Sequence, residues 1–202
     1  MARPKSDIQP RIVRAAKVRF IHEGVDGASL RQIAREAGTS LGMIYYYYPT
    51  KDDLFLAVVE DVYSKLLKDL ASALAPDTPV QERLLRLYVR LGQVSESELS
   101  VVRLIVREAL GSSERLRRLL ERFKRGHIPL VIQTLQDGCA QGVIRNDLPL
   151  VQLLLATMAL GTIPQFVRAL AAEHLPFDKA QDPDEFAAGL LGVLFRGVGA
   201  AT

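Results

Sequence analysis

The stretch SLRQIAREAGTSLGMIYYYYPTKDDLF, residues 29–55, decides how this chain folds. Ser29 is a preferred N-cap residue, and the run that follows it fits a short helix ending at Gly38, because glycine commonly ends helices. A second short helix is expected between Ser40 and Pro49, because proline cannot continue a helix. Two short helices joined by a glycine-containing turn form the helix-turn-helix pattern of DNA-binding proteins.

The second short helix carries four consecutive tyrosines, which cannot all share one face. At 100° per residue, Ile44 and Tyr48 fall on one arc with Leu41 beside them, and this arc is expected to be buried. The opposite arc holds Gly42, Met43, Tyr45 and Tyr46, and Tyr47 lies at its edge.

An outward arc of glycine, methionine and tyrosine is unusual for a solvated surface but suits a DNA groove. Gly42 lets the backbone approach the duplex, tyrosine hydroxyls reach phosphate oxygens, and Met43 fits thymine methyl groups. Lys51 is placed for a phosphate, while Ser29 and Arg31 are placed for the DNA backbone or a base edge.

The structural alternative is that the tyrosines pack a small core, each with its hydroxyl at the rim. We adopt this alternative for Tyr48 and in part for Tyr47. Tyr45 and Tyr46 are expected to face DNA.

The charge distribution also indicates a polyanionic partner. Residues 1–51 hold nine Lys or Arg and four Asp or Glu, a net charge of +5, whereas the other 151 residues hold 17 and 19, a net charge of −2. A basic head on a mildly acidic body favours nucleic acid, and a solvated surface face is the alternative. The single cysteine, Cys139, excludes a disulfide framework and any multi-cysteine metal site.

Nearly the whole chain has a helical apolar period, so we expect an all-α fold with an N-terminal three-helix domain and a larger C-terminal bundle. The helices are expected at about 8–20, 30–37, 40–48, 50–74, 79–94, 98–110, 113–140, 148–171 and 183–197. The APDTP stretch, residues 75–79, resembles a hinge between an N-terminal head and a second domain over 75–202.

Residues 7–67 resemble the DNA-binding domain of the TetR family of bacterial transcriptional regulators. The matching residues are Ile12, Ala15, Ala16, Phe20, Gly24, Ser29, Ile33, Ala34, Ala37, Gly38, Gly42, Ile44, Tyr45, Tyr47, Tyr48, Lys51 and Leu54. The resemblance implies that the helix from Ser40 to Tyr47, the reading helix of a reading unit at about 29–49, enters the major groove. The residues expected to contact DNA are Ser29, Arg31, Ser40, Leu41, Gly42, Met43, Tyr45, Tyr46, Tyr47 and Lys51.

The reading helix departs from the family pattern at two positions. Met43 stands where the family often has threonine, and Leu41 where polar or basic residues are common. Because the helix has no Arg, Asn or Gln for bidentate base recognition, discrimination is expected to depend on Arg31, tyrosine and methyl contacts, and DNA shape.

Residues 148–167 form a run of 20 residues without charge, which is long enough to span a membrane. Two glutamines, two prolines and a lack of flanking aromatic residues argue against a span. We expect instead a helix buried on one side by its own subunit and on the other by a partner. In the resembled family the last two long helices form the dimer interface, which implies a homodimer through residues 148–171 and 183–197 that reads a palindromic operator.

The resemblance also implies a small-molecule cavity enclosed by helices from about 79 to 175, with Pro129 and Pro164 expected to kink them. Glu108 falls on an apolar stripe, where a carboxylate needs a partner, either a nearby arginine such as Arg103 or Arg107 or a ligand. The candidate ligand-binding residues are Leu104, Glu108, Phe123, His127, Met158 and Phe166, for each of which plain packing is the alternative.

The sequence contains no metalloprotease, nucleophile-elbow, P-loop or dinucleotide motif, and its three histidines are widely separated. We therefore expect no enzyme activity, no cofactor and no metal. The expected function is a cytoplasmic transcriptional repressor that a small-molecule effector releases from DNA. A helical adaptor, or an activator without an effector, is the alternative.

Overall fold

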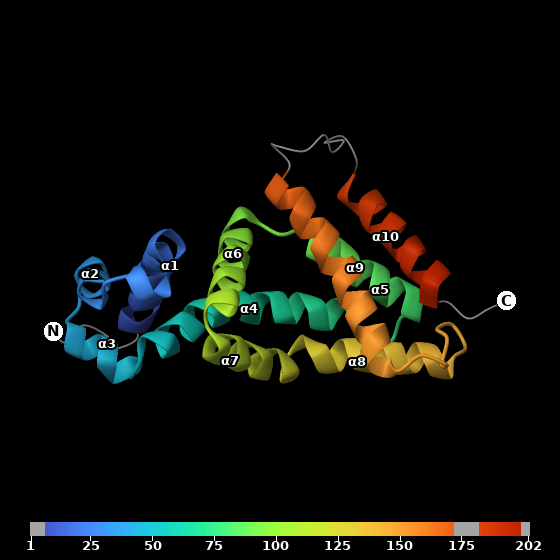
Figure 1. Ribbon diagram of the computed structural model, residues 1–202, viewed down its shortest axis with the longest axis horizontal. Helices are drawn as coiled ribbons and strands as arrows, with labels where there is room; N and C mark the ends of the chain where they lie inside the picture. The colour runs from blue at the N-terminus through green and yellow to red at the C-terminus, as the bar shows by residue number, and fades with distance from the viewer. Residues whose placement is uncertain (1–6, 172–181, 199–202) are drawn as a thin grey trace. The chain divides into compact units, whose positions relative to one another are not determined.

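The computed structural model describes residues 7–171 and 182–198, which contain ten helices and no β-strand. The all-α prediction is therefore confirmed. The helices are α1 (Ile8–Gly27), α2 (Leu30–Glu36), α3 (Leu41–Tyr47), α4 (Lys51–Ala73), α5 (Val80–Gly92), α6 (Glu96–Gly111), α7 (Ser113–Lys124), α8 (His127–Ala140), α9 (Leu150–Ala171) and α10 (Pro183–Val198) (Figure 1).

The chain divides into two compact units, and the N-terminal unit is larger than the predicted domain at 7–67. Its two segments are Met1–Leu66 and Glu96–Arg122, so that α6 and most of α7 belong with the N-terminal helices. The second unit consists of Leu67–Ser95 and Phe123–Thr202. Residues 172–181 and 199–202 of the domain predicted over 75–202 lie outside the described residues.

The first unit is organised around α1, which packs against α2 and α6. Its core side chains are wholly buried, among them Ile12 and Phe20 of α1, Ile33 of α2 and Ile44 of α3. Gly24, with a φ of 79° and a ψ of 166°, breaks the helical geometry near the end of α1, which continues beyond the expected end at about residue 20.

The second unit is organised around α5, which packs against α8, α9 and α10. Figure 1 shows α9 and α10 lying side by side, and these two helices contact each other. Tyr88 of α5 is fully buried, and its hydroxyl donates a hydrogen bond of 2.9 Å to the carbonyl oxygen of Thr157. A side chain at Gly161 would lie 2.6 Å from the Tyr88 ring, so α5 and α9 approach closely only because this residue is glycine.

The single helix predicted over 113–140 is wrong, because α7 ends at Lys124 and α8 begins at His127. Gly126, with a φ of −120° and a ψ of −113°, separates the two helices. Pro129 therefore lies in the first turn of α8, where its missing N–H leaves no helix hydrogen bond unmade, and not inside a helix as predicted. Pro164 does lie inside a helix, as predicted.

One described helix, α9, is long and apolar enough to cross a membrane over Leu150–Ala169. Only 22% of that stretch is buried within the single chain. Its exposed apolar side chains include Val151, Leu155, Ile163 and Val167.

Candidate nucleic-acid interface

The turn between α2 and α3 sets the start of the reading helix. Gly38 has a φ of +61°, a left-handed conformation that glycine adopts without strain. Ser40 then caps α3, because its hydroxyl oxygen accepts a hydrogen bond of 3.2 Å from the backbone N–H of Met43. The sequence indicated the glycine turn at Gly38 and the start of the second short helix at Ser40.

The two faces of α3 differ as the helical arc predicts. Ile44 is fully buried and Tyr48, just after the helix, is 9% exposed. On the other face, Tyr45 is 49% exposed and Tyr46 is 75% exposed. Two exposed tyrosines on one short helix form an aromatic surface that is not needed to hold the helix in place.

The tyrosines also support one another. The rings of Tyr46 and Tyr47 meet edge to face with their centres 5.1 Å apart. The ring centres of Tyr47 and Tyr48 are 6.4 Å apart. Burial raises the pKa of the Tyr48 phenol. Tyr47 is half-buried, so the assignment of Tyr48 and part of Tyr47 to the core agrees with the geometry.

The remaining predicted DNA contacts have different exposures. Arg31, Ser40 and Gly42 are exposed, whereas Ser29, Leu41, Met43 and Lys51 are half-buried. Ser29 precedes α2 but its hydroxyl makes no capping hydrogen bond, which leaves the hydroxyl available to another partner. All of these positions lie within α2, α3 and the residues that flank them, and their contact with DNA stays a prediction.

A capping arrangement fixes the start of α4 directly after the reading helix. The Thr50 hydroxyl accepts a hydrogen bond of 3.1 Å from the N–H of Asp53, and the Asp53 carboxylate accepts one of 3.0 Å from the N–H of Thr50. Hydrogen bonds from Arg118 and Thr50 lower the pKa of Asp53. The Asp53 carboxylate is therefore kept ionised in the first turn of α4, which begins shortly after α3 ends.

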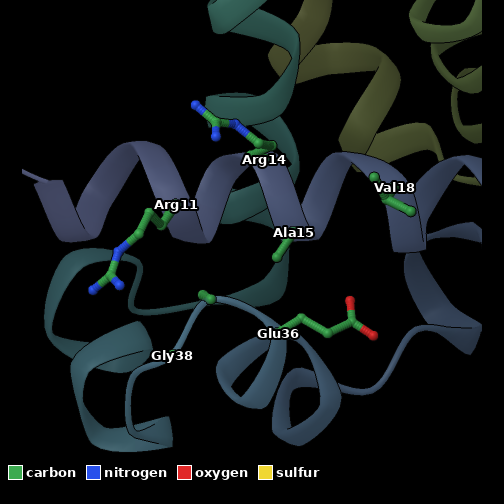
Figure 2. Close-up of a pocket in the computed structure, with 7 residues that line it drawn as sticks. Arg11, Arg14, Ala15, Val18, Glu36 and Gly38 are labelled. Atoms are coloured by element: carbon green, nitrogen blue, oxygen red, sulfur yellow. The ribbon is translucent and has the colours of Figure 1, made fainter.

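Beside the reading unit, α1 and the turn at Gly38 border an open hollow of about 330 Å³. Figure 2 shows Arg11 and Glu36 extending in different directions at its edges, with Ala15 between them. Glu36 is held by Arg19, which donates through Nε at 2.9 Å and lowers the pKa of that carboxyl. Arg11 and Arg14 add positive charge to this side of the unit.

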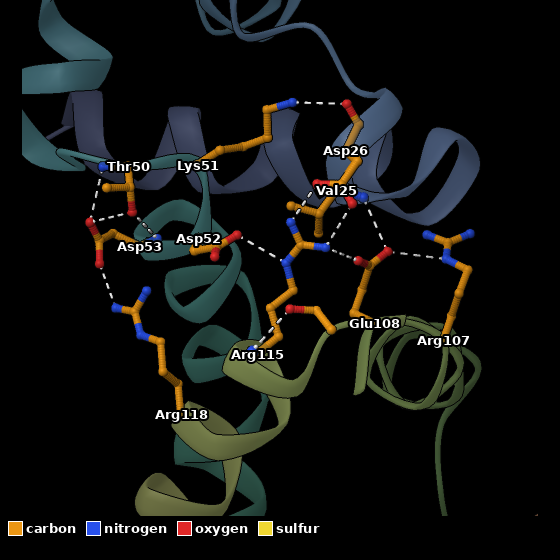
Figure 3. A network of polar contacts seen from close by, with 11 residues as sticks. Val25, Asp26, Thr50, Lys51, Asp52, Asp53, Arg107, Glu108, Arg115 and Arg118 are labelled. Carbon is orange, nitrogen blue, oxygen red and sulfur yellow. Dashed lines mark hydrogen bonds and ion pairs between the residues drawn. The ribbon is translucent and has the colours of Figure 1, made fainter. Parts of the chain in front are cut away.

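The sequence did not indicate the side chains that hold the reading unit to α6 and α7. Arg115 of α7 contacts carboxylates on three other parts of the first unit, which are Asp26, Asp52 and Glu108 (Figure 3). The hydrogen bond from Arg115 lowers the pKa of Asp26. The only sequence signal was the seven-residue spacing of Glu108 and Arg115, which does not by itself reveal partners more than 60 residues away.

The six candidate ligand residues do not fall in one unit. Leu104 and Glu108 belong to the first unit, where both are buried, and Phe123, His127, Met158 and Phe166 belong to the second. Glu108 has the arginine partners that the sequence left open, Arg115 at 2.7 Å and Arg107 at 3.3 Å. In the second unit, the Phe123 and His127 rings lie 5.2 Å apart. Within the described residues, no group of three or more His, Cys, Asp or Glu side chains forms a metal site.

Comparison with known proteins finds a family that matches the N-terminal part of this chain. Residues 12–58 match the model of the family described as bacterial regulatory proteins, tetR family. The HTH-type transcriptional repressor SCO4008 of Streptomyces coelicolor is 29% identical over 175 residues, which cover 84% of this chain and 86% of that protein. The HTH-type transcriptional regulator RutR of Escherichia coli is 33% identical over 106 residues, which cover 50% of this chain and 48% of RutR.

Solved structures share the fold at low sequence identity. The transcriptional regulator FadR of Bacillus subtilis, solved in complex with stearoyl-CoA, superimposes with a TM-score of 0.75 at 17% identity, covering 94% of this chain and 98% of FadR. GusR of Salmonella enterica gives a TM-score of 0.73 at 17% identity, covering 97% of both chains.

Proposed function

This chain is a member of the TetR family of bacterial transcriptional regulators, and we propose that it is a homodimeric repressor that a small-molecule effector releases from a palindromic operator. The observation that carries the DNA-binding part is the exposure of Tyr45 and Tyr46 on α3, opposite the buried Ile44. A helix anchored through one face presents the other face to the major groove, where phosphate and base-edge contacts are made.

The DNA contacts that we propose are the ten positions predicted from the sequence. Tyr45, Tyr46 and the backbone at Gly42 lie on the outward face of α3, while Arg31 lies in α2 and Lys51 begins α4. The tyrosine hydroxyls bind phosphate oxygens, while their rings and Met43 contact thymine methyl groups. Sequence preference then comes from apolar contacts and DNA shape, because α3 carries no bidentate base-reading side chain.

We propose that the dimer forms through α9 and α10. Large apolar side chains are exposed on both helices of the single chain, including Leu155 at 63%, Ile163 at 59% and Val193 at 51%. A second copy related by a two-fold axis covers such a surface and sets two reading helices one turn of DNA apart. This assignment also accounts for the apolar stretch of α9 without a membrane, and the protein then acts in the cytoplasm.

The effector is proposed to bind among the helices that follow α4, and catalysis has no part in the mechanism. The effector changes operator affinity by preferring one spacing of the two reading helices, and a coupling of about 1–3 kcal/mol changes affinity about 5- to 150-fold. Because the fold neighbour FadR was solved with stearoyl-CoA, a long-chain acyl-CoA is the first ligand to test.

The experiment is recovery of the bound sites from genomic DNA by footprinting, followed by titration of one recovered site and of scrambled DNA over a range of salt. We expect a palindromic site bound by a dimer, with an affinity that falls steeply as salt increases. Equal affinity for the recovered and scrambled sites would overturn the proposal. If a recovered operator leaves the affinity for every tested effector unchanged, the effector part of the proposal fails, because linkage is reciprocal.

A further inference from the structure

A single arginine holds three parts of the first unit together. Arg115 lies in the first turn of α7, and its side chain is 9% exposed. Its Nε donates to Asp52 at 2.9 Å, its Nη1 to Glu108 at 2.7 Å, and its Nη1 and Nη2 to the two oxygens of Asp26 at 3.1 and 2.5 Å (Figure 3). All five N–H groups of a guanidinium are donors, so one arginine can serve three carboxylates at once.

Two of these carboxylates lie at the two ends of the reading unit. Asp26 lies four residues before α2 begins at Leu30, and Asp52 lies in the first turn of α4, five residues after α3 ends at Tyr47. A second ion pair joins α7 to the start of α4, because Arg118 of α7 donates to Asp53 at 2.5 Å. Both ends of the helix-turn-helix are therefore tied to α7.

The third carboxylate connects the same arginine to α6 and to the end of α1. Glu108 is 6% exposed, and its Oε1 accepts a hydrogen bond of 3.1 Å from the backbone N–H of Val25. Arg107, its neighbour in α6, donates to the carbonyl oxygen of Phe20 at 2.5 Å. The kink at Gly24 thus lies beside these bonds, and a side chain there would lie 3.5 Å from Glu108 Oε1.

We propose that Arg115 is a positioning residue for DNA reading, which fixes the direction of α3 by fastening Asp26 and Asp52 to α6 and α7. The inference rests on the proposed function, because it concerns how well the reading helix is aimed at an operator. Arg115 touches no DNA and acts only through the two ends of the reading unit.

The geometry of α3 explains why such fastening matters. The helix has seven residues, and of these only Ile44 is buried. Contacts to phosphates tolerate small rotations, but contacts to base edges require hydrogen-bond distances and alignment. Loosening the two ends therefore reduces operator binding more than it reduces binding to arbitrary DNA.

The first test separates positioning from simple charge. Asp26→Ala removes a negative charge whose side chain is 85% exposed, so electrostatics alone would tighten binding to every DNA. Positioning predicts the opposite for the operator, a loss of about tenfold, with binding to scrambled DNA unchanged or slightly tighter. Asp61→Ala is the matched control, because Asp61 is an exposed acid of α4 in the same unit.

The second test removes the arginine itself. Arg115→Met keeps the aliphatic part of the side chain and removes the guanidinium. Arg117→Met is the control, because Arg117 is two residues further along α7 and pairs with Glu114 at the surface. We expect the operator-to-scrambled affinity ratio to fall at least tenfold in Arg115→Met and to stay unchanged in Arg117→Met. Adding Asp26→Ala to Arg115→Met should produce no further loss, because both changes break the same connection.

The comparison is made on dimers whose unfolding transition lies well above the temperature of the titration. If Arg115→Met fails to fold, Asp26→Ala decides alone. An operator affinity of Asp26→Ala equal to or above that of the wild type overturns the positioning role while leaving the proposed function intact. A wild-type protein that prefers no DNA sequence overturns both.

Discussion

The ammonium group of Lys51 donates a hydrogen bond of 3.0 Å to the backbone carbonyl oxygen of Asp26. The two residues lie on either side of the reading unit, one before α2 and one at the start of α4. An ammonium group has three donors, so Lys51 can keep this bond and still contact a phosphate. One side chain therefore closes the reading unit and extends its basic surface.

Replacing Lys51 by alanine should weaken binding to scrambled DNA as well as to the operator, because a phosphate contact carries no sequence information. The slope of log affinity against log salt should become shallower by about one, since one fewer counterion is released. Titrations by fluorescence anisotropy at four or more salt concentrations measure this slope. Lys65→Ala, at an exposed position of α4, should leave the slope unchanged, and a shallower slope in this control would contradict the assignment.

Replacing Tyr46 by alanine should reduce operator affinity about tenfold, which corresponds to about 1.4 kcal/mol. The side chain is 75% exposed, so the free energy of unfolding should change by less than about 0.5 kcal/mol. Urea denaturation and operator titration of the same preparation separate the two effects. Leu110→Ala is the control, because it changes an 86% exposed apolar residue of α6 and should alter neither operator affinity nor the free energy of unfolding. A Tyr46→Ala protein with full operator affinity would contradict the DNA-facing role.

Replacing Gly42 by alanine should change stability and DNA binding in opposite directions. Gly42 is exposed within α3, and a methyl group there would lie 3.8 Å from Ser40 Oγ, which is ordinary contact. Alanine favours the helix by up to about 1 kcal/mol, so the urea midpoint should rise. Operator affinity should fall, because the methyl group keeps the backbone away from the duplex. A rise in both quantities would show that this side of α3 does not approach DNA.

Acid should destabilise the first unit partly through Asp53. Its pKa is lowered in the folded protein, chiefly by the hydrogen bond from Arg118, so the stability it contributes is present above the ordinary aspartate pKa of 3.8 and is lost as pH falls through the folded pKa. Arg118→Ala should therefore lower stability at pH 6 and reduce the loss on acidification. Urea midpoints between pH 6 and pH 3 test this, with the exposed Arg117→Ala as a comparison. Parallel pH profiles for wild type and Arg118→Ala would contradict the linkage.

Replacing Leu155 by aspartate should dissociate the dimer. The side chain is 63% exposed in the single chain, so the change should leave each subunit folded while burying an unpaired charge at the proposed α9–α10 interface. Sedimentation velocity measures the mass, and circular dichroism checks the helix content. Val18→Asp, at a 51% exposed position of α1, should remain dimeric. A dimeric Leu155→Asp protein would place the interface elsewhere.

Local patterns in the sequence were sufficient to predict the reading unit. The N-cap residue Ser40, the turn at Gly38 and the stop at Pro49 act on their immediate neighbours, and the structure places α3 at Leu41–Tyr47. The helical arc likewise predicted that Ile44 is buried and Tyr46 exposed, because the two side chains point to opposite faces of the same short helix.

Long-range packing could not be predicted in the same way. The grouping of α6 and α7 with the N-terminal helices depends on contacts such as Arg115 with Asp26, which are 89 residues apart. The break between α7 and α8 was also missed, although Gly126 stands three residues before Pro129 and marks the start of a new helix. A continuous apolar period hid that boundary, because two consecutive helices can carry the same pattern.

Only Tyr48, Pro49 and Thr50 separate α3 from α4, and of these Tyr48 is buried while Thr50 caps the following helix. This connection has no slack to absorb an inserted or deleted residue, since Tyr48 must stay buried while Thr50 keeps its capping position at the start of α4. Variants that recognise new operators should therefore be sought by exchanging outward side chains at fixed loop length, and a library that varies the length of this connection should yield mostly inactive proteins.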